Sequence, residues 1–460
     1  MRPVVTVAEM RDADAAAPVG EATLIGRAGT AVAVHALALM GGAYGRRVVV
    51  VAGKGNNGAD GKVAAAVLRR RGARVAVVGA DEAVPPCDLV VDAALGTGLR
   101  GPYDAPRPPD GALVLAVDIP SGVDGDTGDA PGHPMAADRT VTFAALKPGL
   151  LQGRGLELSG RVEVADIGLD VGHPAIGLVD DADVARLVPR RPPVTHKWAT
   201  ALAVVAGSPG MEGAAVLATQ AAARAGAGMV RLVVPGGGEG PWPVEAVRTS
   251  LGGAGWCEGV LEVLGRCKAL VIGPGLGRSD ETGREVRRLL AASPVPVVAD
   301  ADALFALGDA KAARRVTDAM QAPRGPDGAA PLVVTPHDGE YERLLGHAPG
   351  PDRVAAARAL ADALGATSLV KGAPTAVATT TGQVRLVASG SSRLATAGTG
   401  DVLSGVIGAF LARGMAPLDA AAIAAHVHGR AAALGPSEGL VAQDLPDLVS
   451  VALSRLVDGG

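Results

Sequence analysis

The sequence has very few aromatic residues, few cysteines and no marked excess of charge of one sign. Only 3 Phe, 3 Trp and 3 Tyr occur in 460 residues, so the cores must be built from Val, Leu, Ile and Ala within a hydrophobic fraction of 48%. The three cysteines, Cys87, Cys257 and Cys267, have no metal-binding spacing, and reduced thiols of a cytosolic protein are expected. A net charge of −4 implies no general polyanion-binding surface, so we expect no nucleic-acid partner.

The sequence also lacks a charged-then-apolar signal segment and any uninterrupted apolar run long enough to cross a bilayer. We therefore expect a cytoplasmic protein with no membrane partner. Its 65 glycines and 33 prolines are spread between apolar runs, which favours many turns over disorder. The length of the chain suits two or three domains.

Short β-branched runs alternate with helix-like segments in the first half of the sequence. Four such runs end in Gly, Pro or Asp and lie at 46–53, 73–80, 87–95 and 112–120. A helix-like segment at 61–71 lies between the first two runs. Continuous apolar runs that alternate with helices predict an α/β fold, in which a parallel sheet is covered on both faces.

A proline- and arginine-rich stretch follows Leu187 and has the composition of a linker. We place a domain boundary there, which predicts domains at 1–187 and 188–460. The second half restarts the alternation, and in it a Gly-rich loop leads into an apolar helix at 398–414. It contains no convincing copy of the first half, so we expect two different α/β folds.

Polar side chains follow three strand ends of the first half. They are Asn56, Asn57 and Asp60; then Asp92 with the loop 96–102; and then Asp118 with Ser121. Ligands of open parallel sheets bind beyond the carboxyl ends of the strands, so these groups are expected to share one crevice. Each Asp is about as well explained as a helix cap or an Asx turn. Together, their hard oxygen atoms suit a cation such as K⁺, Mg²⁺ or Ca²⁺.

The first of these strand ends contains Gly53, Gly55 and Gly58 at the spacing of the dinucleotide-binding fingerprint. A P-loop is excluded, because Asn56 occupies a required glycine position and Val63 replaces the Ser or Thr that holds Mg²⁺. The fingerprint alone also allows an NAD-dependent dehydrogenase, in which Asp81 would bind the ribose.

The strongest signal of the second half is a run of glycines before an apolar helix. Gly398 and Gly400 precede or begin this helix, and successive backbone N–H groups there form an anion hole for a phosphoryl group. Asp401 at the same place can take a proton from a hydroxyl that attacks phosphorus. The alternative is that Asp401 only caps the helix, but a cap needs no preceding glycines.

Other polar positions of the second half also follow predicted strands. His337 is interpreted either as a substrate contact or as a turn histidine, and Lys371 and Thr375 are expected near a nucleotide. His426 and His428 are two residues apart on a helix and face different sides, so we interpret them as non-ligands. The arrangement predicts a kinase-like site.

Four motifs of the first half resemble the N-terminal domain of the YjeF family, the Rossmann-like NAD(P)H-hydrate epimerase. They are "GKGNNGADGKVAA", "DAALGTGLRGP", "VDIPSGVDGDTG" and "TFAALKPG", in that order. The resemblance implies a K⁺ ion held by Asn57, Asp92 and Ser121, and it implies substrate contacts at Asn56, Asn57, Gly58, Ala59, Asp60, Gly96, Thr97, Gly98, Leu99, Arg100, Gly101, Pro102 and Asp118. Ala59 departs from the glycine that the family usually has. We choose Asp118 as the proton-transferring group.

The second half resembles the ribokinase-like domain of NAD(P)H-hydrate dehydratase, through "GPGLG", "TPHDGE", "KGAPT" and "AGTGD" among its motifs. The resemblance implies substrate contacts at Ala214, Gly277, His337 and Asp401. It implies nucleotide contacts at Lys371, Gly372, Ala373, Pro374, Thr375 and Gly400. Trp198 and Asp338 depart from the Gly and Pro that the family usually has.

These resemblances predict a bifunctional repair enzyme of hydrated nicotinamide nucleotides. The first domain would interconvert the R and S epimers of NAD(P)HX, with Asp118 in the catalytic role. The second would dehydrate the S epimer with ADP or ATP and Mg²⁺, with Asp401 as the base. We also expect a homo-oligomer. The alternatives are a ribokinase-class small-molecule kinase with an N-terminal binding domain, and an NAD-dependent dehydrogenase.

Overall fold

The computed structural model describes residues 1–98, 101–321 and 330–459, and it divides the chain into two compact units. The first unit is residues 2–176, and the second is Met1 with the residues from Gly177 onward. The sequence expectation placed the boundary near Leu187. In the structure Val179, Val184 and Val188 are buried in the core of the second unit, because helix α5 (Asp181–Leu187) packs on its C-terminal helices.

The first unit is a parallel sheet with strand order β3-β2-β4-β6-β8-β9. The strands of this sheet are β2 (Arg47–Ala52), β3 (Arg74–Gly79), β4 (Leu89–Ala93), β6 (Leu113–Val117), β8 (Arg139–Phe143) and β9 (Arg161–Ala165). Strands β5 (Tyr103–Asp104) and β7 (Gly132–His133) pair with each other in a separate two-stranded sheet, and β1 (Arg2–Val4) belongs to neither. Its helices are α1 (Val7–Ala15), α2 (Glu21–Met40), α3 (Asn56–Arg70) and α4 (Gly153–Leu158), with a short 3₁₀ turn at Pro148–Leu150.

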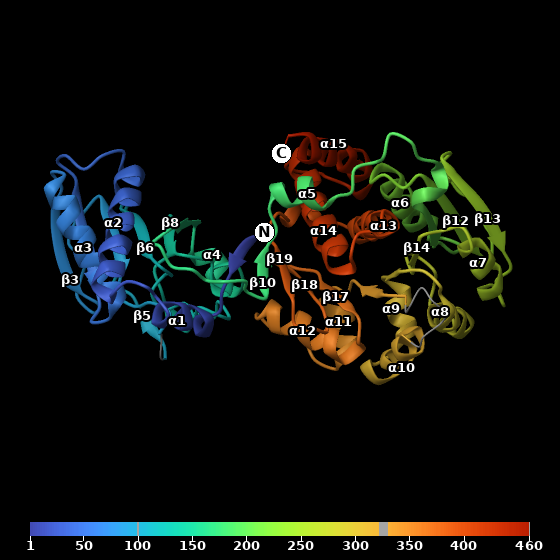
Figure 1. The fold of residues 1–460 in the computed structure, drawn as a ribbon, viewed down its shortest axis with the longest axis horizontal. Helices are drawn as coiled ribbons and strands as arrows, with labels where there is room; N and C mark the ends of the chain where they lie inside the picture. The colour runs from blue at the N-terminus through green and yellow to red at the C-terminus, as the bar shows by residue number, and fades with distance from the viewer. Residues whose placement is uncertain (99–100, 322–329, 460) are drawn as a thin grey trace. The chain divides into compact units, whose positions relative to one another are not determined.

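Both faces of this sheet are buried, as the apolar runs predict. Val48 and Val50 of β2 pack under α2 and α3, whereas Val49 and Val51 face a second cluster around Tyr103. Figure 1 shows α2 and α3 side by side beside the sheet, at the blue end of the chain. A side chain at Gly29 would lie 2.5 Å from Val63 Cβ, so the two helices approach closely. Small residues therefore build this core in place of aromatic ones.

Helix α2 is long and apolar enough to cross a membrane by length and composition alone. The sequence expectation found no such uninterrupted run, and Arg27 and His35 interrupt this one. Ala28, Val32 and Ala33 of α2 lie in the core beneath the sheet. One face of α2 therefore packs into the core of this unit.

The second unit has the strand order β10-β19-β18-β17-β16-β15-β14-β11-β12-β13; the pairs from β17 to β13 in this order are parallel, and β18 is antiparallel to both β17 and β19. Its strands are β10 (Ile176–Leu178), β11 (Ala201–Val205), β12 (Met229–Pro235), β13 (Ala246–Leu251), β14 (Ala269–Ile272), β15 (Val297–Ala299), β16 (Leu332–Val334), β17 (Thr367–Val370), β18 (Thr375–Ala378) and β19 (Val384–Val387). The predicted α/β class with parallel sheets is confirmed in both units.

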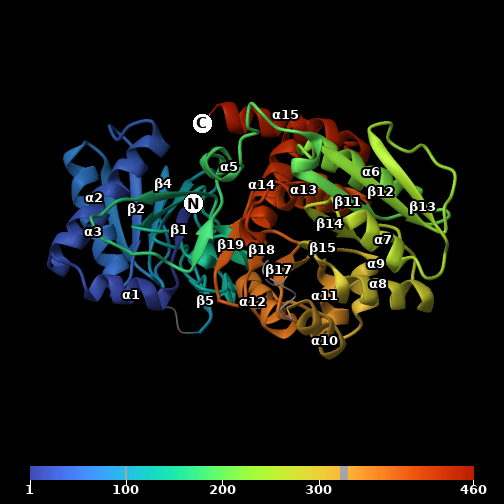
Figure 2. The ribbon, with the colours of Figure 1, turned by 45° about the vertical axis from the view of Figure 1, so that its right-hand side comes forward.

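Helices cover both faces of the second sheet. They are α5, α6 (Glu212–Arg224), α7 (Cys257–Leu264), α8 (Asp280–Ala292), α9 (Asp302–Leu307), α10 (Ala310–Gln321), α11 (Asp338–Leu345), α12 (Arg353–Leu364), α13 (Thr399–Ala412), α14 (Pro417–Leu434) and α15 (Leu445–Asp458). Short 3₁₀ turns lie at Lys197–Thr200, Ser392–Leu394 and Ala442–Asp444. Figures 1 and 2 show α13, α14 and α15 on one side of this sheet and α8, α10 and α12 on the other.

Candidate functional sites in the two units

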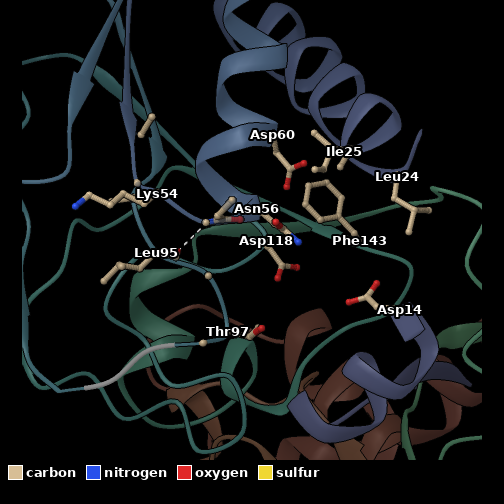
Figure 3. A pocket seen from close by; sticks show the side chains of 18 of the residues that line it. Asp14, Leu24, Ile25, Lys54, Asn56, Asp60, Leu95, Thr97, Asp118 and Phe143 are labelled. Atoms are coloured by element: carbon tan, nitrogen blue, oxygen red, sulfur yellow. Dashed lines mark hydrogen bonds between the residues drawn. The ribbon is translucent and has the colours of Figure 1, made fainter. Parts of the chain in front are cut away.

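A cavity of about 1060 Å³ lies beyond the carboxyl ends of β2, β4 and β6 in the first unit. The predicted residues that line it are Asn56, Asn57, Asp60, Gly96, Thr97, Gly98 and Asp118. The structure thus brings the three predicted strand ends to one place. Figure 3 shows the carboxyl groups of Asp14, Asp60 and Asp118 turned toward this cavity from three different elements. Gly58, Ala59, Gly101 and Pro102 are not among its described lining residues, and Leu99 and Arg100 lie outside the described residues.

The glycine spacing of the first motif reflects close backbone contacts. A Cβ at Gly53 would lie 1.8 Å from the carbonyl oxygen of Ala94, and one at Gly58 would lie 2.0 Å from that of Gly53. Helix α3 begins at Asn56, five residues before the predicted start, so both asparagines lie in its first turn. Ala59 also lies in this helix and has no positive φ, so its methyl group causes no backbone strain.

Asn57, Asp92 and Ser121 meet around the backbone of residues 94 and 95. Asn57 Nδ2 donates to the carbonyl oxygens of Leu95 (2.8 Å) and Val117 (2.9 Å). Ser121 Oγ accepts from Leu95 N at 2.8 Å, and Asp92 Oδ2 accepts from Ser121 N at 2.9 Å. Burial raises the pKa of Asp92.

This oxygen set fits a monovalent cation. Asp92 is fully buried, and no cationic side chain of the described residues pairs with its carboxyl group. A buried carboxylate without a counter-ion is strongly disfavoured. Both amide hydrogens of Asn57 are used by carbonyl groups, which leaves Oδ1 as a further oxygen ligand.

Asp118 is held by a lysine and a threonine in a strained backbone conformation. Lys147 Nζ lies 2.7 Å from Asp118 Oδ1, and Thr142 Oγ1 donates to the same oxygen at 3.0 Å. Asp118 has a φ of 64°, which a non-glycine residue rarely adopts outside functional sites. Lys147 is 1% exposed. This lysine lies in the motif "TFAALKPG", but the sequence-based prediction assigns it no role. Its position shortly after a predicted strand is the signal that could have identified it as a site residue.

Five further acidic residues line the cavity with Asp118, namely Asp14, Glu21, Asp60, Asp81 and Glu82, and the pKa of two of them is raised. Burial, followed by the charges of Asp118 and Asp14, raises the pKa of Asp60 to about 8. Burial also raises the pKa of Asp14, against the opposing effect of Lys147. Asp60 therefore carries its proton at neutral pH. Asp14 and Glu21 were not predicted, since they come from α1 and α2, far from the strand ends in sequence.

The anion hole predicted in the second unit lies at the start of α13. Gly398 caps this helix with a φ of 90°, and Thr399, Gly400 and Asp401 form its first turn. The first-turn N–H groups of a helix of this length carry a partial positive charge. Burial, followed by the charge of Asp300, raises the pKa of Asp401 to about 7. The turn that was predicted to bind an anion and a carboxyl group of raised pKa are thus adjacent.

The glycine loop that follows β14 is held against α6 and α9. A Cβ at Gly275 would lie 3.0 Å from Ala214 Cβ, which places Ala214 of α6 beside this loop. Gly277 N donates to Asp302 Oδ2 at 2.8 Å, and Arg278 Nε donates to Asp302 Oδ1 at 2.7 Å. Asp302 was not predicted; it orients a loop that comes from a neighbouring strand.

His337 caps the N-terminus of α11. Its Nδ1 accepts from Gly339 N at 3.0 Å, and Glu340 Oε2 accepts from His337 N at 3.0 Å. The side chain is 63% exposed, and its Nε2 lies 3.6 Å from Glu340 Oε1. Asp338 accepts from Arg353 at 2.8 Å, and Arg353 also donates to the carbonyl oxygen of Lys371. Asp338, which replaces the proline that the family usually has, thus helps through Arg353 to hold the segment Lys371, Gly372, Ala373, Pro374 and Thr375 in place.

The remaining singled-out residues lie away from these contacts. The Trp198 ring stacks on the guanidinium of Arg266 at 3.8 Å. His426 Nε2 lies 2.8 Å from Asp181 Oδ1. His428 is buried, and burial lowers its pKa to about 4. Within the described ranges, no group of three His, Cys, Asp or Glu side chains is placed to hold a metal ion.

The chain matches two family models. Residues 202–455 match the family described as NAD(P)H-hydrate dehydratase, and residues 21–85 and 79–149 match the YjeF-related protein N-terminus. The bifunctional NAD(P)H-hydrate repair enzyme Nnr of Mycobacterium tuberculosis strain H37Rv is 40% identical over 437 residues, which span 88% of this chain and 85% of the relative. The Escherichia coli protein of the same name is 33% identical over 451 residues, spanning 87% and 84%.

One solved structure shows the fold of the larger part of the chain. A ribokinase-like superfamily protein of Enterococcus faecalis covers 63% of this chain and 98% of its own, with a TM-score of 0.51 and 22% sequence identity. This likeness confirms the predicted ribokinase-like fold.

Proposed function

The chain belongs to the family of bifunctional NAD(P)H-hydrate repair enzymes, and we propose that each of its two units carries one of the two activities. The resemblance drawn from the motifs is confirmed, and the chain is an enzyme of nicotinamide nucleotide repair. We assign epimerisation of R- and S-NAD(P)HX to the first unit and dehydration of S-NAD(P)HX to the second. The observation that carries the assignment is the presence of both sites, a cavity rich in carboxyl groups and a glycine-lined helix start with an adjacent acid.

Epimerisation requires that the hydroxyl group at C6 leaves one face of the ring and returns to the other. A proton joins the leaving hydroxyl, the ring nitrogen lone pair expels water as an iminium forms, and water then adds to the opposite face and loses a proton. We propose Asp118 as the proton-transferring group, with Lys147 and Thr142 fixing its orientation. Asp60, with its pKa of about 8, supplies a second proton to the same cavity.

We propose that Asn57, Asp92 and Ser121 hold K⁺ in the first unit. The uncompensated buried carboxyl group of Asp92 supports this assignment. The ion would supply positive charge that fixes the loop at Leu95, from which the lining residues Gly96, Thr97 and Gly98 follow.

Dehydration in the second unit begins with phosphorylation of the S-epimer hydroxyl by ADP or ATP. Asp401 takes the hydroxyl proton as oxygen attacks phosphorus, and the first-turn N–H groups of α13 donate hydrogen bonds to the oxygens of the transferred phosphoryl group. The ring nitrogen lone pair then expels phosphate, and loss of a C5 proton restores the nicotinamide. Lys371, Gly372, Ala373, Pro374, Thr375 and Gly400 are the proposed nucleotide contacts, and Ala214, Gly277 and His337 the proposed substrate contacts.

Mg²⁺ would screen the charge between donor and acceptor when it is bound to the nucleotide. The described side chains do not form a site that would hold it without the nucleotide, and we derive no step from it. We propose a cytoplasmic location and a homo-oligomer. Strand β13 is the terminal strand of its sheet, and the edge of a terminal strand can pair with a second copy.

The test is the return of reduced-nicotinamide absorbance when the full chain meets chemically hydrated NADH with ADP or ATP. A mixture of epimers should be repaired completely by the wild type. Asp118→Asn should repair the S fraction at the normal rate and the R fraction only as it epimerises spontaneously. A stable phosphate ester in place of NADH would indicate a simple kinase, and hydride transfer without nucleotide would indicate a dehydrogenase; either outcome refutes the proposal.

A further inference from the structure

Asp300, at the end of β15, has a buried carboxylate that none of the proposed steps uses. Both of its oxygens are engaged: Oδ1 accepts from Lys371 Nζ at 2.8 Å, and Oδ2 accepts from Ser404 Oγ at 2.6 Å. The side chain is only 2% exposed. It therefore joins the ends of three elements, β15, β17 and α13, at one point, and it cannot itself reach a bound substrate.

This pair lies directly against the proposed phosphoryl site. A Cβ at Gly400 would lie 3.2 Å from Lys371 Nζ and 3.8 Å from Asp300 Oδ2. The ammonium group thus contacts the first turn of α13, where the N–H groups would bind the phosphoryl oxygens. A side chain at position 400 would require the lysine ammonium to shift slightly away from this turn.

The backbone around Asp300 is held in place at some energetic cost. Ala301 has a φ of 49° and a ψ of −117°, a backbone conformation that residues other than glycine rarely adopt. A Cβ at Gly273 would lie 1.8 Å from the Asp300 carbonyl oxygen, so the loop after β14 packs against this residue. Strained residues persist where the surrounding structure over-determines them, and they cluster at functional sites.

Lys371 has several carboxyl groups near it, and it is paired with only one of them. Asp300, Glu340 and Asp401 all act on its charge; burial lowers the pKa of Lys371, but these carboxyl groups outweigh burial and raise it. Burial, followed by the charge of Lys371, lowers the pKa of His428 to about 4, against the opposing effect of the Thr399 backbone in the first turn of α13. Glu340 is largely buried, which raises its pKa.

The basicity of Asp401 depends on which carboxylate Lys371 pairs with. If Lys371 paired with Asp401, the ammonium would stabilise the carboxylate and make it a weaker proton acceptor. In the structure the ammonium is hydrogen-bonded to Asp300 instead. Burial, followed by the charge of Asp300, raises the pKa of Asp401 to about 7, against the opposing charge of Lys371. A base that titrates near the working pH is the most effective one.

We propose that Asp300 is a positioning residue of the dehydratase reaction, which holds the Lys371 ammonium against the first turn of α13 and apart from Asp401. This proposal rests on the proposed function of the second unit. Lys371 then meets the phosphoryl group as it is transferred, while Asp401 stays free to take the hydroxyl proton.

The test uses Asp300→Asn in the full chain, with purified S epimer and Mg–ADP. The near-isosteric amide removes the charge, so Lys371 turns to Asp401. We expect kcat to fall roughly 10²-fold while the KM for ADP changes less. Because Asp401 must be ionised to accept a proton, wild-type activity rises through pH 7, and this acid limb should move about one unit lower in the variant.

Glu285→Gln is the matched control, since Glu285 is also a buried carboxylate of the second unit, paired with Arg288 at 2.8 Å. It should lower the melting temperature without moving kcat or the acid limb. In a Lys371→Met background, Asp300→Asn should have little further effect, because it acts through the lysine. The proposal fails if Asp300→Asn lowers stability alone, or if its effect multiplies with that of Lys371→Met.

A failure of the proposed function would give different results from a failure of the proposal for Asp300 alone. A wild-type chain that binds Mg–ADP in calorimetry but never restores NADH from the S epimer refutes the dehydratase assignment, and this proposal with it. A wild type that restores NADH, together with an Asp300→Asn variant of unchanged kcat and acid limb, refutes only the role of Asp300.

Discussion

The two units use the same charge arrangement, a lysine paired with one carboxylate beside a second carboxyl group of raised pKa. In the first unit Lys147 lies 2.7 Å from Asp118, and the pKa of Asp60 is raised to about 8 by burial and then by Asp118. In the second unit Lys371 lies 2.8 Å from Asp300, and the pKa of Asp401 is raised to about 7 by burial and then by Asp300.

The difference lies in which acid reaches the ligand. Asp118 is 15% exposed and lines the cavity, so the acid that the lysine orients is the proposed reacting group. Asp300 is 2% exposed and both of its oxygens are occupied, so here the unpaired Asp401 is left for chemistry. A lysine–carboxylate pair therefore indicates a site without indicating its catalytic member, which only accessibility reveals.

The largest effect is expected from Asp401→Asn, which removes the accessible acid of the second unit. Dehydration of the S epimer should slow roughly 10²–10⁴-fold, the usual contribution of a positioned general base. Epimerisation should continue, because it depends on the first unit. The measurement is the rate of NADH return from pure S epimer beside the R-to-S conversion rate; a dehydration loss below tenfold would contradict the comparison.

Asp60→Asn tests the corresponding acid of the first unit and should slow epimerisation roughly 10²-fold. The wild-type rate should be high below pH 8 and fall above it, because the proton on Asp60 is lost as the pH passes its pKa of about 8. The variant should lack this decline. A decline at the same pH in both proteins would assign it to another group.

Although Asp60→Asn should slow epimerisation, it should stabilise the first unit at alkaline pH. The folded pKa of Asp60 is above its ordinary value of 3.8, so its contribution to stability is full below that value and is lost as the pH rises through about 8. Above pH 8 Asp60→Asn removes a buried charge and should raise the melting temperature of the first unit. A gain of about 1 kcal/mol would appear as roughly 2–4 °C.

Replacing K⁺ by a bulky organic cation should slow the reaction of the first unit only, and by an intermediate amount. Epimerisation should fall roughly tenfold, since the carboxyl group of Asp92 loses its counter-ion and the loop at Leu95 loosens. Dehydration of pure S epimer should be unaffected by the exchange. Full epimerase activity without K⁺ would show that the buried oxygen set has a structural role only.

The smallest effect is expected from Ala59→Gly, which restores the residue that the family usually has. Ala59 lies within α3 in an ordinary helical conformation, so glycine should destabilise the first unit by about 1 kcal/mol. The epimerisation rate should change less than about twofold, because Ala59 does not line the cavity. Thermal unfolding and epimer conversion measure the two quantities; a large gain in rate would show that the methyl group restricts the site.

Sequence reasoning located much of the first cavity because its groups lie directly after strands. Asn56, Asp60 and Asp118 follow apolar runs whose carboxyl ends must meet at one edge of a parallel sheet. It missed Asp14 and Glu21, which precede the sheet in the chain and reach the cavity only through the packing of α1 and α2. It also placed the start of α3 too late, because glycines and asparagines are poor helix formers and the contacts that require them are tertiary.

The sequence by itself determined the layered α/β architecture, the glycine turns and the acids at the strand ends, because these depend on local periodicity and on the geometry of parallel strands. Only the tertiary structure decided which acid each lysine joins. Lys147 is 29 residues from Asp118 and Lys371 is 71 residues from Asp300. Such pairs form where burial removes water from several charges at once, and which charges come together depends on how the elements pack.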